Sequence, residues 1–136
     1  MDAKTTRQYI LSLTLDELRP MHELYSKVLM GKIIQPRITG FTEEQPPVWF
    51  YIGEKHDHII VPHTYCSCRD FLIRVMSKKQ SLACRHLLMQ RIAELKGKYR
   101  VVEMNREEYL RIVYEIVRIN ISPTLRKLLY ISRRKT

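Results

Sequence analysis

The three cysteines of this chain and one histidine form a single spaced pattern, which constrains the fold more than any other feature of the sequence. Cys66 and Cys68 flank one serine, and after a spacer of fifteen residues Cys84 and His86 flank one arginine. Thiolates and imidazoles are the ligands that Zn²⁺ prefers, and four of them close a tetrahedral structural site. We therefore predict that Cys66, Cys68, Cys84 and His86 bind one structural zinc ion.

Two other interpretations of these residues are open. Cysteine is among the residue types most often buried, so the three cysteines could be ordinary core residues. Three further histidines, His56, His58 and His63, lie close to the cysteines in sequence. Each is an alternative ligand, although a turn and two strands are expected there, which favours surface or hairpin positions. An odd number of cysteines argues against a disulfide framework.

The residues before Cys66 predict a β-hairpin, and those after Cys84 predict a helix. The β-branched and aromatic segments 48–52 and 58–65 predict a β-hairpin. In it Trp49 and Tyr51 share one face and Phe50 points to the other. A Cys-x-Cys pair can bind one ion only where the strand bends or bulges, because an unbroken strand sends alternate side chains to opposite faces.

The remaining segments predict helices joined by an irregular connector. We expect helices over 4–12 and from Thr14 onward with a break near Pro20, a connector over 32–47, and a helix from Cys84 to Gly97. Asn105 caps an amphipathic helix, and Ser122 starts the last one. The apolar stripe expected on the Asn105 helix comprises Tyr109, Ile112, Val113, Ile116 and Val117.

These elements predict an α+β protein with N-terminal helices, a β-hairpin, a zinc-bound helix and C-terminal helices. At 136 residues a single domain is expected over 1–136. It comprises a helical N-terminal region and connector (1–47), a zinc finger (48–97) and basic C-terminal helices (98–136). The last helix is short and leucine-rich, so we expect it to pack on this chain, on a partner, or on a second copy in a homo-oligomer.

The formal net charge of +10 lies entirely in the second half of the chain. Up to Cys68 there are 7 Lys or Arg and 8 Asp or Glu, whereas from Arg69 onward there are 17 and 6. Such asymmetry favours a polyanionic partner, most often nucleic acid, with an acidic protein as the alternative. Candidate contacts to DNA are Arg69, Arg74, Lys78, Lys79, Arg85, Arg91, Arg126, Lys127, Arg133, Arg134 and Lys135.

Other function classes lack a signal in the sequence. There is no P-loop, no glycine-rich phosphate cradle and no carboxylate cluster of the kind a nuclease needs, so no enzyme is predicted. No apolar run approaches the roughly 20 residues that span a bilayer, and the N-terminus has no signal pattern. We expect a protein of the cytoplasm, or of the nucleus in a eukaryote, that is not secreted and has no membrane partner.

The segment from about residue 48 to 96 resembles a SWIM zinc finger. The likeness rests on Cys66-Ser67-Cys68, on the following Arg69-Asp70-Phe71, and on Cys84-Arg85-His86-Leu87-Leu88. The resemblance implies that the first cysteine pair ends a β-hairpin and that the second pair opens a helix. In size the chain is similar to the small SWIM recombination mediators of the Shu complex, which implies homologous recombination and repair alongside a RecA-family recombinase or paralogue. Ala83 matches the small residue before the third cysteine in some relatives. The alternative is a protein-interaction adaptor or transcriptional regulator whose finger makes no direct DNA contact.

Overall fold

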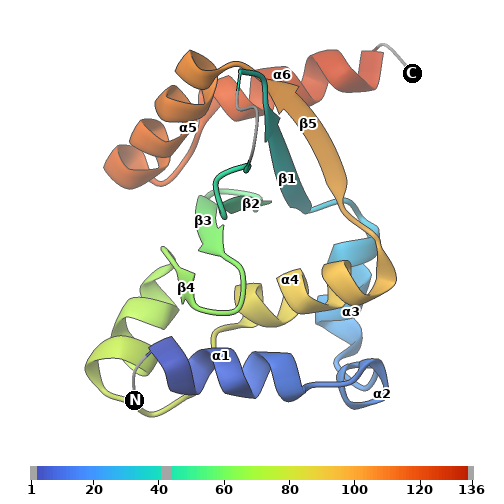
Figure 1. The fold of residues 1–136 in the computed structure, drawn as a ribbon, viewed down its shortest axis with the longest axis vertical. Helices are drawn as coiled ribbons and strands as arrows, with labels where there is room; N and C mark the ends of the chain where they lie inside the picture. Colours follow the sequence, from blue (N-terminus) through green and yellow to red (C-terminus); the bar gives the residue numbers. More distant parts are fainter. Residues whose placement is uncertain (1–2, 41–43, 135–136) are drawn as a thin grey trace.

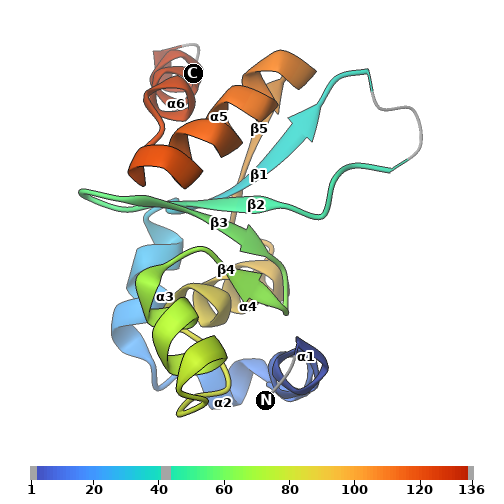
Figure 2. The same ribbon diagram turned by 90° about the vertical axis from the view of Figure 1, so that its left-hand side faces the viewer.

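A five-stranded sheet lies between two groups of helices in the computed structural model, which describes residues 3–40 and 44–134 (Figures 1 and 2). Within these residues the strand order is β4-β3-β2-β1-β5. β1 and β5 are parallel and every other neighbouring pair is antiparallel. The strands are β1 (Ile33–Ile38), β2 (Trp49–Ile52), β3 (Asp57–Val61), β4 (Tyr65–Cys66) and β5 (Arg100–Met104).

The helices divide between the two faces of the sheet (Figure 2). The larger group lies on one face and comprises α1 (Ala3–Ser12), α2 (Leu15–Leu18), α3 (His22–Leu29), the π-helix η1 (Phe71–Ser77) and α4 (Arg85–Lys96). On the opposite face lie α5 (Arg106–Ile119) and α6 (Pro123–Arg134). None of the helices in the described ranges combines the length and apolar composition required to cross a membrane. The predicted α+β class is confirmed.

Alternation along the strands creates two separate hydrophobic cores. Successive side chains of a strand point to opposite faces. Tyr51 and Ile60 are therefore buried with α1 and α4, whereas Phe50 and Ile59 are buried with α5 and α6. The predicted division of the hairpin aromatics is confirmed, since Trp49 packs on the same core as Tyr51 and Phe50 is fully buried on the other side.

Most of the predicted helix boundaries are confirmed. Thr14 forms a capping box with Glu17 at the start of α2, and α3 resumes only after Pro20. Asn105 forms the corresponding capping box at α5. Gly97 ends α4 with a φ of +64°, a left-handed conformation that glycine adopts without a steric penalty.

The expectation of an irregular connector over 32–47 was wrong at its first half, where β1 forms. Pro36 predicts a break in regular structure, but it lies at a position where β1 pairs with β5 and no longer with β2. The side-chain amide of Gln45 takes the place of a neighbouring strand: its oxygen accepts from the Ile38 N–H at 2.6 Å and its nitrogen donates to the Ile38 carbonyl at 3.1 Å. A proline is tolerated on such an unpaired strand side, because no N–H is required there.

The stripe predicted on the Asn105 helix is wrong at one position. Ile112 and Ile116 are buried against the sheet, and Tyr109 and Val113 pack beside them. Val117, however, is 71% exposed. It lies on a different side of α5, together with the exposed Leu110 and Tyr114. α5 therefore buries one apolar face and leaves a second apolar face exposed.

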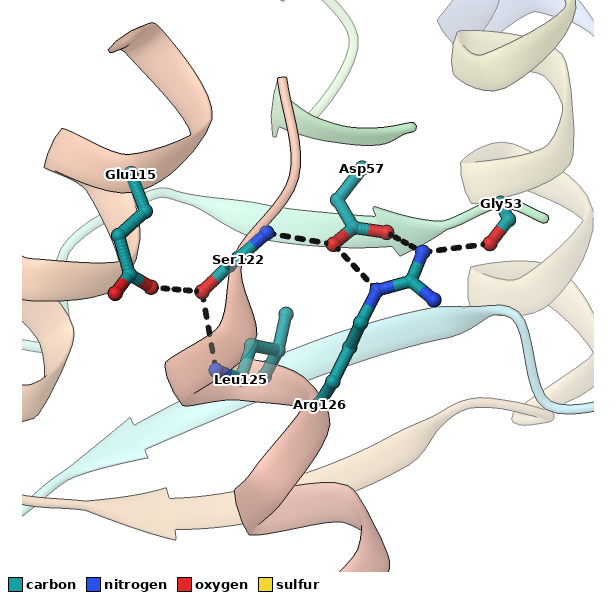
Figure 3. A network of polar contacts seen from close by, with 6 residues as sticks. All are labelled: Gly53, Asp57, Glu115, Ser122, Leu125 and Arg126. Atoms are coloured by element: carbon teal, nitrogen blue, oxygen red, sulfur yellow. Dashed lines mark hydrogen bonds and ion pairs between the residues drawn. The ribbon is translucent and has the colours of Figure 1, made fainter. Parts of the chain in front are cut away.

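An ion pair between the buried Asp57 and the partly exposed Arg126 joins the β2–β3 hairpin to α6 (Figure 3). The Asp57 side chain has no solvent exposure, and its two oxygens accept from Nε and Nη2 of Arg126 at 3.0 and 2.6 Å. Asp57 also accepts from the Ser122 N–H at 2.9 Å, while Arg126 donates to the Gly53 carbonyl at 2.8 Å. A buried carboxylate is stable only when its oxygens accept hydrogen bonds and a positive charge lies beside it.

The network continues to α5 through the carboxylate of Glu115 (Figure 3). Burial acts to raise the pKa of Glu115, but hydrogen bonds from Ser122 and Thr124 outweigh it, so the net pKa is lowered. The Ser122 hydroxyl donates to Glu115 at 2.7 Å and accepts from the Leu125 N–H at 3.0 Å. The start of α6 is thereby tied to both α5 and the hairpin.

We predict that Asp57→Asn will destabilise the fold by about 3 kcal/mol, because it leaves the Arg126 guanidinium without its buried counter-charge. Urea unfolding monitored by circular dichroism measures this loss. The control is Glu107→Gln, which breaks the exposed i,i+4 pair with Arg111 and should cost less than about 0.5 kcal/mol. Equal losses in the two variants would contradict the role assigned to Asp57.

Candidate metal centre

Cys66, Cys68, Cys84 and His86 lie together beneath the sheet, as the sequence pattern predicts. Their ligand atoms all lie within 4.8 Å of one another, and all four residues are buried. None of the three cysteines forms a disulfide. A tetrahedron with Zn–S bonds of about 2.3 Å has sulfurs separated by roughly 3.8 Å, so this spacing is compatible with one metal ion.

Ser67 explains how Cys66, at the end of β4, and Cys68, just after it, point to the same side. β4 pairs with β3 only through Tyr65 and Cys66. At the next residue, the Ser67 N–H donates to the Ile59 carbonyl at 2.9 Å, and the Ser67 hydroxyl, not a backbone carbonyl, accepts from the Ile59 N–H at 2.8 Å. The side chain thus completes the pairing of β3 while the backbone turns away. This is the bend that the sequence pattern required.

The second pair is positioned by the start of α4. Cys84 is the N-cap residue with extended backbone angles, and His86 lies in the first turn. The His86 ring packs against Tyr51 of β2 and His58 of β3, with centroid separations of 4.5 and 4.6 Å. The metal centre therefore links β4 to α4, and the sheet holds the imidazole in place.

The electrostatics of the three sulfurs favour a cation between them. Hydrogen bonds to Cys68 and Cys84, together with burial, raise the pKa of the Cys66 thiol. For Cys84 the contact with Cys66 lowers the pKa, but the contact with Cys68 and burial outweigh it and raise the pKa to about 12. Cys68, which accepts from both thiols and from the Phe71 N–H at 3.3 Å, has a lowered pKa. Three adjacent thiolates form only when a positive charge offsets their repulsion and desolvation.

A metal ion fits this donor set. Nδ1 of His86 is buried and has no hydrogen-bond partner within the described residues. Three buried sulfurs and one buried imidazole this close together are compatible with a closed structural metal site, the type in which all four positions are taken by protein ligands. When bound, such an ion would supply folding free energy rather than chemistry.

The alternative ligands among the histidines lie outside the four-residue group. His58 touches the His86 ring, and burial together with the neighbouring His86 lowers its pKa to about 4. His63 binds Glu94 on α4, with 2.9 Å between Nε2 and the carboxylate. His56 is exposed beside the β2–β3 turn. The sequence did not point to Ser67 or Tyr51, because neither residue belongs to a recognisable ligand pattern.

The candidate DNA contacts fall into three groups: those in ion pairs, those that are exposed, and those whose side chains lie outside the described residues. Four arginines form ion pairs within the chain: Arg74 with Asp70, Arg85 with Glu23, Arg91 with Glu94, and Arg126 with Asp57. Arg69, Lys78, Lys79 and Lys127 are exposed, and no carboxylate among the described residues lies within ion-pair distance of them. The side chains of Arg133 and Arg134, and all of Lys135, lie outside the described residues.

Comparison of the chain with family models, with curated proteins and with solved structures gave no match. The functional assignment therefore depends on the site itself and on the charges around it. The most informative features are the Cys₃His group and the exposed cations on the segment that joins its two halves.

We predict that the purified protein contains about one equivalent of zinc and that Cys84→Ser loses most of it, because a hydroxyl is a poor substitute for a thiolate ligand. Elemental analysis measures the zinc content. Since metal binding acts as folding free energy, a strong chelator should also lower the melting temperature of the wild-type protein. The matched control is His56→Gln, an exposed residue outside the group. Full zinc retention by Cys84→Ser would refute the site.

Proposed function

We propose that this chain is a zinc-stabilised nucleic-acid-binding protein of the SWIM type that assists DNA recombination or repair with a RecA-family recombinase or paralogue. The proposal rests on the Cys₃His group between a hairpin end and a helix start, and on the sequence resemblance to SWIM fingers. The metal ion has a structural role, and the protein acts by binding rather than by catalysis.

The observation that carries the proposal is a set of exposed cations next to the metal centre. The fifteen-residue spacer begins at Arg69, forms η1 and then turns at Lys78 and Lys79. Lys79 has a φ of +54°, which marks a tight turn in the exposed segment after η1. Phe71 and Val75 are buried beneath it, so the core anchors the loop whose tip carries the charges. Lysines held in this way are suited to phosphate contacts.

The nucleic-acid proposal predicts salt-dependent binding that involves Lys78 and Lys79. Each phosphate contact contributes about 0.9 to the slope of log K against log salt, so K78Q/K79Q should reduce the slope by about 1–2. Fluorescence anisotropy with labelled single- and double-stranded DNA at several salt concentrations measures this. The control K55Q/K98Q removes the same charge from other exposed positions. No binding by the zinc-loaded wild type, or equal effects of the two double variants, would contradict the assigned contacts.

A protein-interaction adaptor is the second candidate, and the exposed face of α5 supports it. Leu110, Tyr114 and Val117 are 58%, 61% and 71% exposed and follow one another at helical spacing. An exposed apolar stripe of this kind fits a partner's helix or groove.

If the adaptor role is correct, a RecA-family ATPase should remain associated with the protein after nuclease treatment, and Val117→Lys should abolish that association. Co-purification followed by immunoblotting measures it. Val117→Lys should leave the melting temperature and the zinc content unchanged, because the side chain is outside both cores. Loss of the association on nuclease treatment would instead indicate that nucleic acid bridges the two proteins.

A further inference from the structure

A basic pocket of about 380 Å³ opens at one end of the sheet, and none of the four metal ligands lines it. Its wall is built from four places far apart in sequence: the α3–β1 junction, the β2–β3 turn, the start of β5 and the middle of α6. Three cations, Lys32, Arg100 and Arg126, line this pocket, against one carboxylate, that of Glu54. Because Arg126 is already paired with the buried Asp57, the described lining carries an excess of one positive charge, which still attracts anions.

One of the three cations, Arg126, is held in position by hydrogen bonds of the fold, and the side chain of Arg100 passes close to Gly31. Asp57 and the Gly53 carbonyl fix Nε and Nη2 of Arg126, and Nη1 takes no part in those bonds (Figure 3). Arg100 lies against Gly31, which has a φ of +77°; a Cβ at this glycine would come within 3.2 Å of Arg100 Cδ. Donors fixed before a ligand arrives lose little conformational entropy on binding.

The pocket also offers an aromatic surface. Tyr130 of α6 lines it and is 61% exposed. Nucleic-acid bases stack on exposed aromatic rings, and guanidinium groups bind phosphate oxygens through paired, charge-assisted hydrogen bonds. Pockets that bind small ligands usually have volumes of about 300–1,000 Å³, so a single nucleotide is of suitable size.

We propose that this pocket binds a nucleoside monophosphate group, with the phosphate on Lys32, Arg100 and Arg126 and the base on Tyr130. The group can be a free nucleotide or the 5′-phosphorylated end of a strand, since both present the same chemistry. The inference goes beyond the proposed function, because it depends neither on the metal centre nor on Lys78 and Lys79.

Isothermal titration calorimetry with AMP and with inorganic phosphate tests the pocket. Lys32→Gln should weaken AMP binding by about tenfold, because it removes one charged donor to the phosphate. Glu54→Gln should strengthen it by several-fold, because it removes the one carboxylate among the described residues of the lining. Tyr130→Ala should weaken AMP binding but leave inorganic phosphate unaffected. Circular dichroism confirms that each variant is folded, and Lys98→Gln is the matched charge control.

The two sources of the phosphate are distinguished with short single strands that differ only at the 5′ end. Tighter binding of the 5′-phosphorylated strand than of the 5′-hydroxyl strand, with the difference lost in Lys32→Gln, supports recognition of strand ends. Equal binding of the two strands, with AMP bound as predicted, supports a free nucleotide. Absence of AMP binding by the wild type, or identical AMP affinities for Lys32→Gln and Glu54→Gln, would overturn the proposal. K78Q/K79Q leaves the pocket intact, so this variant should bind AMP like the wild type even where its DNA binding is weakened. The pocket proposal and the proposed function can therefore fail independently of each other.

Discussion

The half of the structure that contains α1, α2, α3, η1 and α4 depends on four side chains that meet where β4 ends and α4 begins. Three buried sulfurs cannot all carry negative charge without a cation, and a thiol that stays protonated is a poor ligand. β4 has only two residues, and η1 lies between it and α4 in the sequence, so β4 contributes little apolar area of its own to the contact with α4. A metal ion would therefore substitute for hydrophobic area that this short strand cannot provide.

The other half, which contains α5 and α6, is stabilised by a different kind of interaction. Asp57, Arg126 and the α5–α6 junction form a network of ion pairs and hydrogen bonds, and the second core packs around Phe50, Ile112 and Leu125. The two cores lie on opposite faces of the sheet, whose strands send alternate residues into each of them. The structure thus combines one layer that contains the candidate metal centre with a second layer held by ion pairs, hydrogen bonds and apolar packing.

Local patterns in the sequence were sufficient to predict the ligand set, the hairpin and the helix caps. Each depends on residues a few positions apart, as with Thr14 and Glu17 or Cys84 and His86. Features that join distant segments could not be predicted in this way. β1 forms because β5 pairs with it from about 66 residues away, and this pairing outweighs the effect of Pro36. Asp57 is a partner of Arg126 across 69 positions, so nothing near either residue signals the pair.

Both edges of the sheet are poor templates for a further strand. β4 is only two residues long and ends in the turn made by Ser67. β5 is longer, but Arg100 and Glu103 place charges of opposite sign along it. Natural sheets resist strand addition and aggregation by having edge strands that are very short or that carry charged side chains. The chain can therefore expose the apolar face of α5 and still avoid the edge-to-edge polymerisation that threatens open sheets.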